Sequence, residues 1–141
     1  MPRAPAAAPT LFAATLARTG AVLADRVLVA TGAASMRGLL GRARMAPGEG
    51  VYFPAATFGA LHSLWMRFPF DALYLDRRGR VRRVLRAVPP GRLCPWDLGT
   101  VAALELPAGA AGGVRRGDVV VLADAPTVPN GALAQGGAPP P

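Results

Sequence analysis

Apolar residues in this chain come in short runs, and Gly, Pro or charged residues interrupt almost every run after a few positions. Such short runs, bounded by turn residues, predict strands rather than helices. We expect two strands in 16–31, on either side of Thr19–Gly20, and further strands at 51–55, 61–68, 70–75, 80–88, 101–107 and 119–122. Many short strands separated by Gly and Pro predict a mainly β domain, a sandwich or barrel with little helix.

One segment departs from the strand pattern. The stretch SMRGLLGRARMAPGEG, residues 35–50, predicts one or two short helical turns. Ser35 is a suitable N-cap, Leu39 and Leu40 would face inward, and Gly41 could end the helix.

The most basic segment of the chain is expected to lie in a hairpin. Residues 76–79, DRRG, begin with Asp and end with Gly, as a type I turn prefers. Residues 80–88 would then return antiparallel to 70–75. The run RRGRVRRVLR, 77–86, puts arginines on both faces of this strand, which indicates an edge strand or a bulged one. The alternative is a ribbon that binds the phosphates of a nucleic acid.

Strand alternation places three polar side chains among apolar neighbours. In 61–68, His62 shares a face with Leu64 and Met66. In 70–75, Asp71 shares a face with Leu73 and Leu75, and in 101–107 Glu105 does so with Val101 and Ala103.

A carboxylate on an apolar face needs a hydrogen-bond or ion-pair partner. We expect Asp71 to accept hydrogen bonds from loop amides or to pair with Arg67. For Glu105 we expect an ion pair with an arginine.

Composition sets the boundaries of the domain. Residues 1–10 and 125–141 are rich in Ala, Pro and Gly, so we expect a flexible lead and a disordered tail around one domain at 11–124. No apolar run is long enough to span a membrane. The N-terminus lacks a convincing cleavage site after its apolar stretch, which favours a cytoplasmic protein; the alternative is export, with the Ala-rich N-terminus as the signal.

The net charge of +8 is weaker evidence for a nucleic-acid partner than it looks. All 16 basic residues are Arg, and the chain has no Lys and no Ile, a bias typical of a GC-rich genome. Charge of this origin bears on solubility and non-specific association. The single cysteine excludes an intrachain disulfide and a metal site built on paired cysteines.

Two residues could carry chemistry of their own. His62, the only histidine, could act as a base or a ligand, although a half-buried histidine bonded to backbone is the plainer interpretation. Cys94 would be a nucleophile only if a cation, a histidine or a helix N-terminus stabilised its thiolate, and otherwise it is a small packed thiol. Diagnostic metal-ligand spacing, phosphate loops and dinucleotide fingerprints are missing, so we expect no metal and no cofactor.

Five ordered blocks resemble a bacterial and archaeal family, the domain of unknown function 192. The blocks are RGLLGR (37–42), PGEGVYF (47–53), HSLWMRFPFDALYLDRRGRV (62–81), CPW (94–96) and ALELPAGAAGGVRRGDVV (103–120). The resemblance covers about residues 16–122. It implies a jelly-roll-like β-sandwich with one or two short helices and no established activity, in a family some of whose members are exported or lipid-anchored. The family's common W-M-K-N-T is here WMRFP, 65–69, so no role of that Asn or Thr carries over.

These observations favour an uncharacterised, basic, monomeric β domain that acts as a non-enzymatic binding or accessory module. An unidentified small ligand is the expected partner, and neither a nucleic acid nor a membrane is expected. The candidate ligand-binding residues lie in or near the block 61–71: His62, Trp65, Met66, Arg67, Asp71, Cys94, Trp96 and Glu105. The first alternative is a hydrolase-like enzyme in which Asp71 or Glu105 orients His62 as a base. The second is nucleic-acid binding through the run 77–86.

Overall fold

Seven strands, and no helix, make up the part of the chain that the structure describes. This computed structural model describes residues 11–30, 44–56 and 66–125. The strands are β1 (Leu11–Leu16), β2 (Val22–Val29), β3 (Glu49–Phe53), β4 (Phe70–Leu75), β5 (Val81–Val88), β6 (Ala102–Pro107) and β7 (Val120–Asp124). The prediction of a mainly β domain is therefore confirmed.

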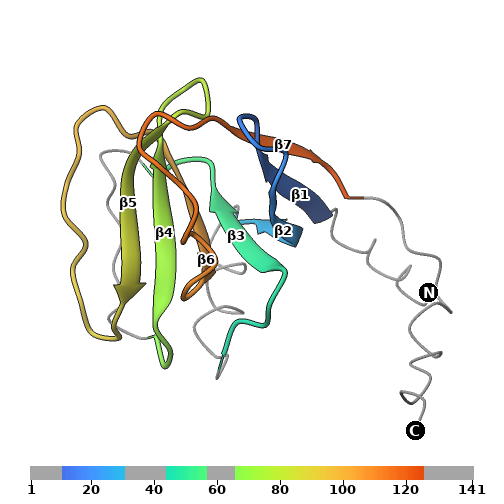
Figure 1. Cartoon of the computed structure of the whole chain (residues 1–141). Helices are drawn as coiled ribbons and strands as arrows, with labels where there is room; N and C mark the ends of the chain where they lie inside the picture. Colours follow the sequence, from blue (N-terminus) through green and yellow to red (C-terminus); the bar gives the residue numbers. More distant parts are fainter. Residues whose placement is uncertain (1–10, 31–43, 57–65, 126–141) are drawn as a thin grey trace, which may run out of the picture.

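The strands form one mixed sheet in the order β5-β4-β6-β3-β2-β1-β7. The pair β2–β3 is parallel, and the other five pairs are antiparallel. The sheet curls. The chain that enters β7 passes the β4–β5 turn and then continues to pair with β1, at the other end of the sheet (Figure 1). A single bridge between Arg80 and Val119 joins these ends, and the sheet does not close.

The curl gives the sheet an inner face, where side chains from both ends of the strand order meet. Leu73, Leu75, Leu104 and Leu106 of the central strands belong to its cluster. The other members come from β1, β2, β5, β7, the start of β6 and the β6–β7 connection: Ala14, Leu16, Ala24, Val27, Val81, Ala102, Ala111, Val114 and Val120.

The alternate residues of the central strands form an outer face, which is also buried. Every residue of β4 is buried, as expected of a strand covered on both sides. The outer face carries two clusters, one of Met45, Val51, Met66, Phe68, Phe70 and Ala72, the other of Ala56, Tyr74, Cys94 and Ala103.

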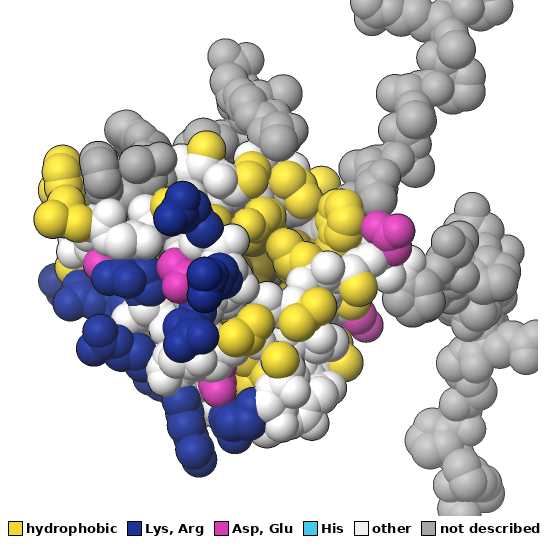
Figure 2. Space-filling view, turned by 90° about the horizontal axis from the view of Figure 1, so that it is seen from above, with side chains coloured by type: hydrophobic (Ala, Val, Ile, Leu, Met, Phe, Trp, Pro, Cys, Tyr) yellow, Lys and Arg dark blue, Asp and Glu magenta, His cyan; other side chains and the backbone are white. Residues whose placement is uncertain are grey.

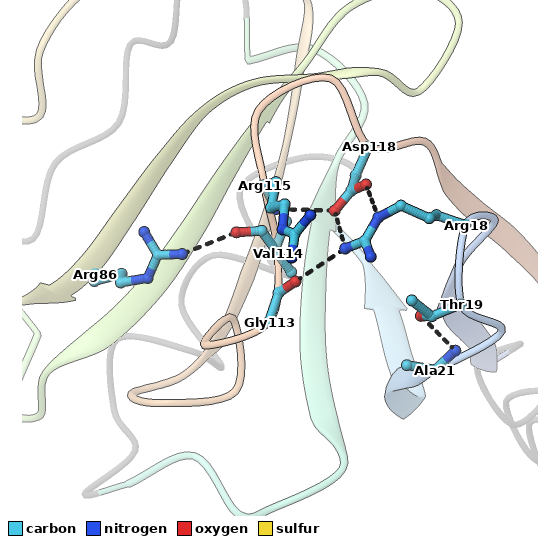
Figure 3. Close-up of polar contacts among 8 residues, drawn as sticks. All are labelled: Arg18, Thr19, Ala21, Arg86, Gly113, Val114, Arg115 and Asp118. Atoms are coloured by element: carbon cyan, nitrogen blue, oxygen red, sulfur yellow. Dashed lines mark hydrogen bonds and ion pairs between the residues drawn. The ribbon is translucent and has the colours of Figure 1, made fainter.

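The β6–β7 connection is fastened across the inner face from two sides (Figure 3). From β5, Arg86 donates to the carbonyl oxygen of Val114 at 2.9 Å. From the β1–β2 turn, Arg18 donates to both oxygens of Asp118, at 2.7 and 3.1 Å, and to the carbonyl oxygen of Gly113. The Arg18 guanidinium lowers the pKa of Asp118 to about 2. These contacts hold the connection over the inner cluster.

The hairpin prediction is confirmed in its pairing and in its position. Strand β5 pairs antiparallel with β4 and forms one edge of the sheet, with register shifts that mark bulges. Arginines on both sides of a strand suit such an edge because they discourage further pairing.

Other predictions are corrected or stay outside the described residues. The jelly-roll-like arrangement is not confirmed, because the strands form one curled sheet. The strand predicted over 61–68 is wrong at Met66–Phe68, where Pro69 restricts the preceding residue and the chain bends before β4. The short helix predicted from Ser35 to Gly41 lies outside the described residues, so one or two helices are not confirmed, and the chain turns at 47–48 before β3. The first strand is β1, earlier than the sequence placed it.

The β4–β5 turn provides a test of how closely β7 approaches it. Gly79 has a φ of 76°, and a Cβ there would lie 2.7 Å from the carbonyl oxygen of Val120. We expect Gly79→Ala to lower the free energy of unfolding by about 2 kcal/mol or more, because it adds a backbone collision to left-handed strain. Gly20→Ala is the control, since Gly20 has a similar φ of 71° in open space. Urea unfolding measures both, and equal losses would contradict the close approach of β7.

Candidate functional site

Asp71 joins the end of β5 to the β6–β7 connection and is not part of an open site. Its side chain lies on the inner face, and the residue is 1% exposed. One oxygen accepts the Ala87 N–H at 2.8 Å, and the other accepts the N–H groups of Gly109 (3.0 Å) and Ala111 (2.9 Å). The interpretation of Asp71 as a partner of loop amides agrees with these bonds.

The bond to Ala87 lies at an irregular point of the hairpin. The register of β4 and β5 shifts between Phe70 and Ala72, and Ala87 has a φ of 49°. A non-glycine residue in this region is strained, so surrounding contacts must hold it. The Asp71 carboxylate supplies one of them.

Among the described residues, Glu105 is a buried acidic residue with one carboxyl oxygen that accepts no hydrogen bond. It lies on the outer face of β6, opposite Val51 of β3 and Ala72 of β4 in the two ladders. The residue is 3% exposed, and its Oε2 has no hydrogen-bond partner among the described residues. Burial raises the pKa of Glu105 to about 8. Among the described residues no arginine forms the predicted ion pair with Glu105, and its neighbours in both adjacent strands are apolar.

Cys94 and Tyr74 lie near Glu105 on the same face. The Tyr74 hydroxyl donates to the carbonyl oxygen of Pro95 at 2.8 Å and thereby fixes the chain around Cys94. Burial raises the pKa of the Cys94 thiol, the charge of Glu105 raises it further, and the Tyr74 hydroxyl opposes the shift. A buried thiol kept in its neutral form is a poor nucleophile.

A cleft of about 420 Å³ opens beside this group, between β5 and the segment that follows it. Cys94, Arg86 and Arg92 contribute to its walls. The rest of the lining is mostly apolar: Val84, Leu85, Ala87, Val88, Pro89, Leu93 and Pro95. Apolar walls with a few polar groups are typical of small-ligand sites.

The candidate residues do not all converge. Met66, Cys94 and Glu105 belong to the buried outer face, whereas Asp71 lies on the inner one. Two others are exposed, Arg67 and Trp96. His62 and Trp65 lie outside the described residues.

Tyr74 is the residue of this group that the sequence did not single out. Its signal was available, because alternation sets it opposite to Asp71 in a strand with no other polar residue. A buried tyrosine needs a partner for its hydroxyl, and here the partner is a backbone carbonyl in a later loop.

Two arginines of the basic run 77–86 make contacts within the fold. Arg82 donates two hydrogen bonds to Asp97, at 3.0 and 3.1 Å, and lowers the pKa of Asp97 to about 2. Arg86 holds the β6–β7 connection. Four arginines of the run remain exposed at the surface: Arg77, Arg78, Arg80 and Arg83.

The part of the chain that the structure describes contains neither a cluster of metal-ligating side chains nor a membrane-spanning helix. No group of three or more His, Cys, Asp or Glu side chains there could hold a metal ion. No helix there is long and apolar enough to cross a membrane.

Comparison with known families agrees with the sequence blocks. The model of the family DUF192, described as "Uncharacterized ACR", matches residues 15–122. The chain belongs to the DUF192 family. The resemblance drawn from the five blocks is therefore confirmed, and the DUF192 match includes the whole group of Cys94, Tyr74 and Glu105.

Solved structures of similar shape support the fold of this DUF192 domain. A protein of unknown function from Novosphingobium aromaticivorans has a TM-score of 0.69 and 22% identity, over 84% of this chain and 89% of that one. A putative transcription regulator from Sinorhizobium meliloti has a TM-score of 0.64 and 22% identity, over 82% and 96%. No curated protein matches the chain. At this identity the likeness establishes the fold alone.

Proposed function

We propose that this DUF192 domain is a non-enzymatic binding module whose cleft, between β5 and residues 89–95, takes a small ligand with an apolar body. The observation that carries the proposal is the cleft itself. Its volume of about 420 Å³ suits a small organic molecule, and its lining is mostly apolar.

The buried group of Cys94, Tyr74 and Glu105 adds polar atoms to the proposed ligand site. Cys94 lies in the cleft wall, and Glu105 is close enough that its carboxylate, when ionised, raises the pKa of the thiol. With a pKa of about 8, Glu105 is mostly a neutral carboxylic acid at neutral pH, able to donate and to accept a hydrogen bond. Its Oε2 has no hydrogen-bond partner among the described residues, which favours a ligand or a bound group that completes its hydrogen bonding.

The geometry of the acidic residues favours binding over catalysis. A base needs a free carboxylate to orient it, and the two oxygens of Asp71 are occupied by three backbone N–H groups. The thiol of Cys94 is held in its unreactive form. These contacts weaken the hydrolase-like alternative in the form that uses Asp71, and they weaken a separate role of Cys94 as a nucleophile.

Nucleic-acid binding has weaker support. Arg82 and Arg86 of the basic run serve structural contacts, which leaves four exposed arginines for phosphates. The likeness to a putative transcription regulator extends to the fold and not to its partner.

The proposal is tested with anilinonaphthalenesulfonate, a fluorescent probe for apolar clefts. We expect saturable binding with one site per chain. We also expect the probe to slow alkylation of Cys94, the sole cysteine, by N-ethylmaleimide. Val88→Phe puts a ring into the cleft and should weaken binding about tenfold or more. Val22→Phe changes an exposed residue of β2 and should leave binding unaltered.

Thermal unfolding is used to check that both variants are folded. Binding that Val88→Phe leaves unchanged, or that fails to protect Cys94, would contradict the assignment of the cleft.

A further inference from the structure

Three large apolar side chains stand out from the surface on one segment, residues 89–100, which connects β5 to β6. Leu93, Trp96 and Leu98 are 77%, 74% and 79% exposed. Figure 1 shows this segment running outside β5, beyond the edge of the sheet. Single exposed apolar residues are ordinary, whereas three on one short projecting segment mark a contact surface.

Specific bonds hold this segment in its exposed position. Its middle is fixed by the Tyr74 hydroxyl, which donates to the Pro95 carbonyl oxygen at 2.8 Å. Next to Trp96, the Asp97 carboxylate accepts two hydrogen bonds from Arg82 and one from the Thr100 hydroxyl. The apolar side chains are therefore presented by an anchored loop.

The surroundings of the segment are basic. Arg83 lies directly opposite Tyr74 in the β4–β5 ladder, on the face where Tyr74 meets Pro95, and it is exposed. Arg92 belongs to the segment and is exposed as well. Figure 2 shows arginine side chains gathered over one side of the molecule, with hydrophobic side chains at the margin beside them. The whole chain has a net charge of +8.

We propose that Leu93, Trp96 and Leu98 insert into the surface of an anionic lipid bilayer while the neighbouring arginines contact its phosphates. Trp is favoured at the membrane–water boundary, aliphatic side chains enter the acyl region, and basic side chains are attracted to anionic headgroups. A peripheral contact of this kind needs no spanning segment, so it differs from the membrane association that the sequence argued against.

Charge and shape distinguish this partner from others. A second copy of the chain carries the same positive charge and would be repelled. A single-stranded nucleic acid would need aromatic stacking, and two of the three projecting side chains are aliphatic. An anionic bilayer satisfies both the apolar and the basic parts of the surface.

The test is co-sedimentation of the full chain with vesicles of phosphatidylcholine, alone or mixed with phosphatidylglycerol. We expect binding to the mixed vesicles that weakens as salt is added. Trp96→Ser/Leu98→Ser should weaken it about tenfold or more, because two inserted side chains are lost. Leu93 is kept in this variant because it also lines the cleft, so the result is independent of the proposed ligand site.

The control is Val22→Ser/Val121→Ser, which removes two exposed valines from β2 and β7 and should bind like the wild type. Circular dichroism is used to check that both variants are folded. Absence of wild-type binding to the mixed vesicles, or equal binding by Trp96→Ser/Leu98→Ser, would overturn the proposal. So would a wild-type dimer in sedimentation that this variant abolishes, since the segment would then join two copies of the chain.

Discussion

Replacing Asp71 with alanine is expected to lower the free energy of unfolding by about 3 kcal/mol or more, because it leaves three backbone N–H groups without their acceptor. These groups belong to the end of β5 and to the connection after β6. The bond to Ala111 is buried, so water cannot easily replace the lost oxygen.

Asp71→Asn gives a finer test of the same contact. An amide keeps the shape of the side chain but has one acceptor oxygen, while its NH₂ group faces a donor. We therefore expect a loss of about 2 kcal/mol or more. Asp124→Ala, at the exposed end of β7, should change stability by less than about 0.5 kcal/mol.

Urea unfolding measures these differences, and amide hydrogen exchange locates them. Exchange at Ala87, Gly109 and Ala111 should accelerate in both Asp71 variants. Wild-type stability in Asp71→Asn would show that the carboxylate is not needed for these loops, and the residue would again be free for a role in a site.

The position of Asp71 illustrates how far the sequence alone could reach. Strand alternation put its side chain among Leu73 and Leu75, and the cost of burying a carboxylate then required a partner. The sequence could not say which amides, because two of them lie 38 and 40 residues further along the chain. Their proximity results from the pairing of β4 with β6.

Glu105 shows where the same reasoning fails. Alternation placed it on the face of Ala103 correctly, but the expected arginine is missing among the described residues. A strand's neighbours decide what an outer-face side chain meets, and here the neighbours are Val51 and Ala72. Single-strand patterns do not reveal which strands lie side by side.

The architecture was predictable only in part for a related reason. Alternating apolar residues predict buried faces equally well for two packed sheets and for one curled sheet. The parallel pairing of β2 with β3, across a long connection, has no local sequence signal. The β4–β5 hairpin was predictable because its turn residues and its strands are contiguous in the chain.

Glu105→Gln should make the protein more stable at neutral and alkaline pH. The pKa of Glu105 is about 8 in the folded protein, against a reference of 4.5 for an exposed glutamate. Between these values the folded state binds more protons than the unfolded state. The stability is therefore full below pH 4.5, falls as pH rises through this window, and is at its lowest above pH 8.

The expected effect follows from this shift. The slope in the window approaches about 1.4 kcal/mol per pH unit, and Glu105→Gln should remove it. At pH 8 the variant should exceed the wild type by about 4 kcal/mol, whereas below pH 4.5 the two should be nearly equal. Asp97 and Asp118 do not add a slope here, since a pKa of about 2 places their titration below the window.

Urea unfolding across this pH range measures the effect, with Glu49→Gln as the matched control. Glu49 is the chain's other glutamate, half-buried at the start of β3, and its replacement measures how much of the slope arises from a second glutamate. His62 is the remaining side chain with an ordinary pKa inside the window, so His62→Gln separates its contribution from that of Glu105. If the slope persists in Glu105→Gln and vanishes in His62→Gln, the buried carboxyl is ionised at neutral pH. Oε2 of Glu105 would then need a hydrogen-bond donor from the ligand, and Glu105 would present an anion to the ligand site.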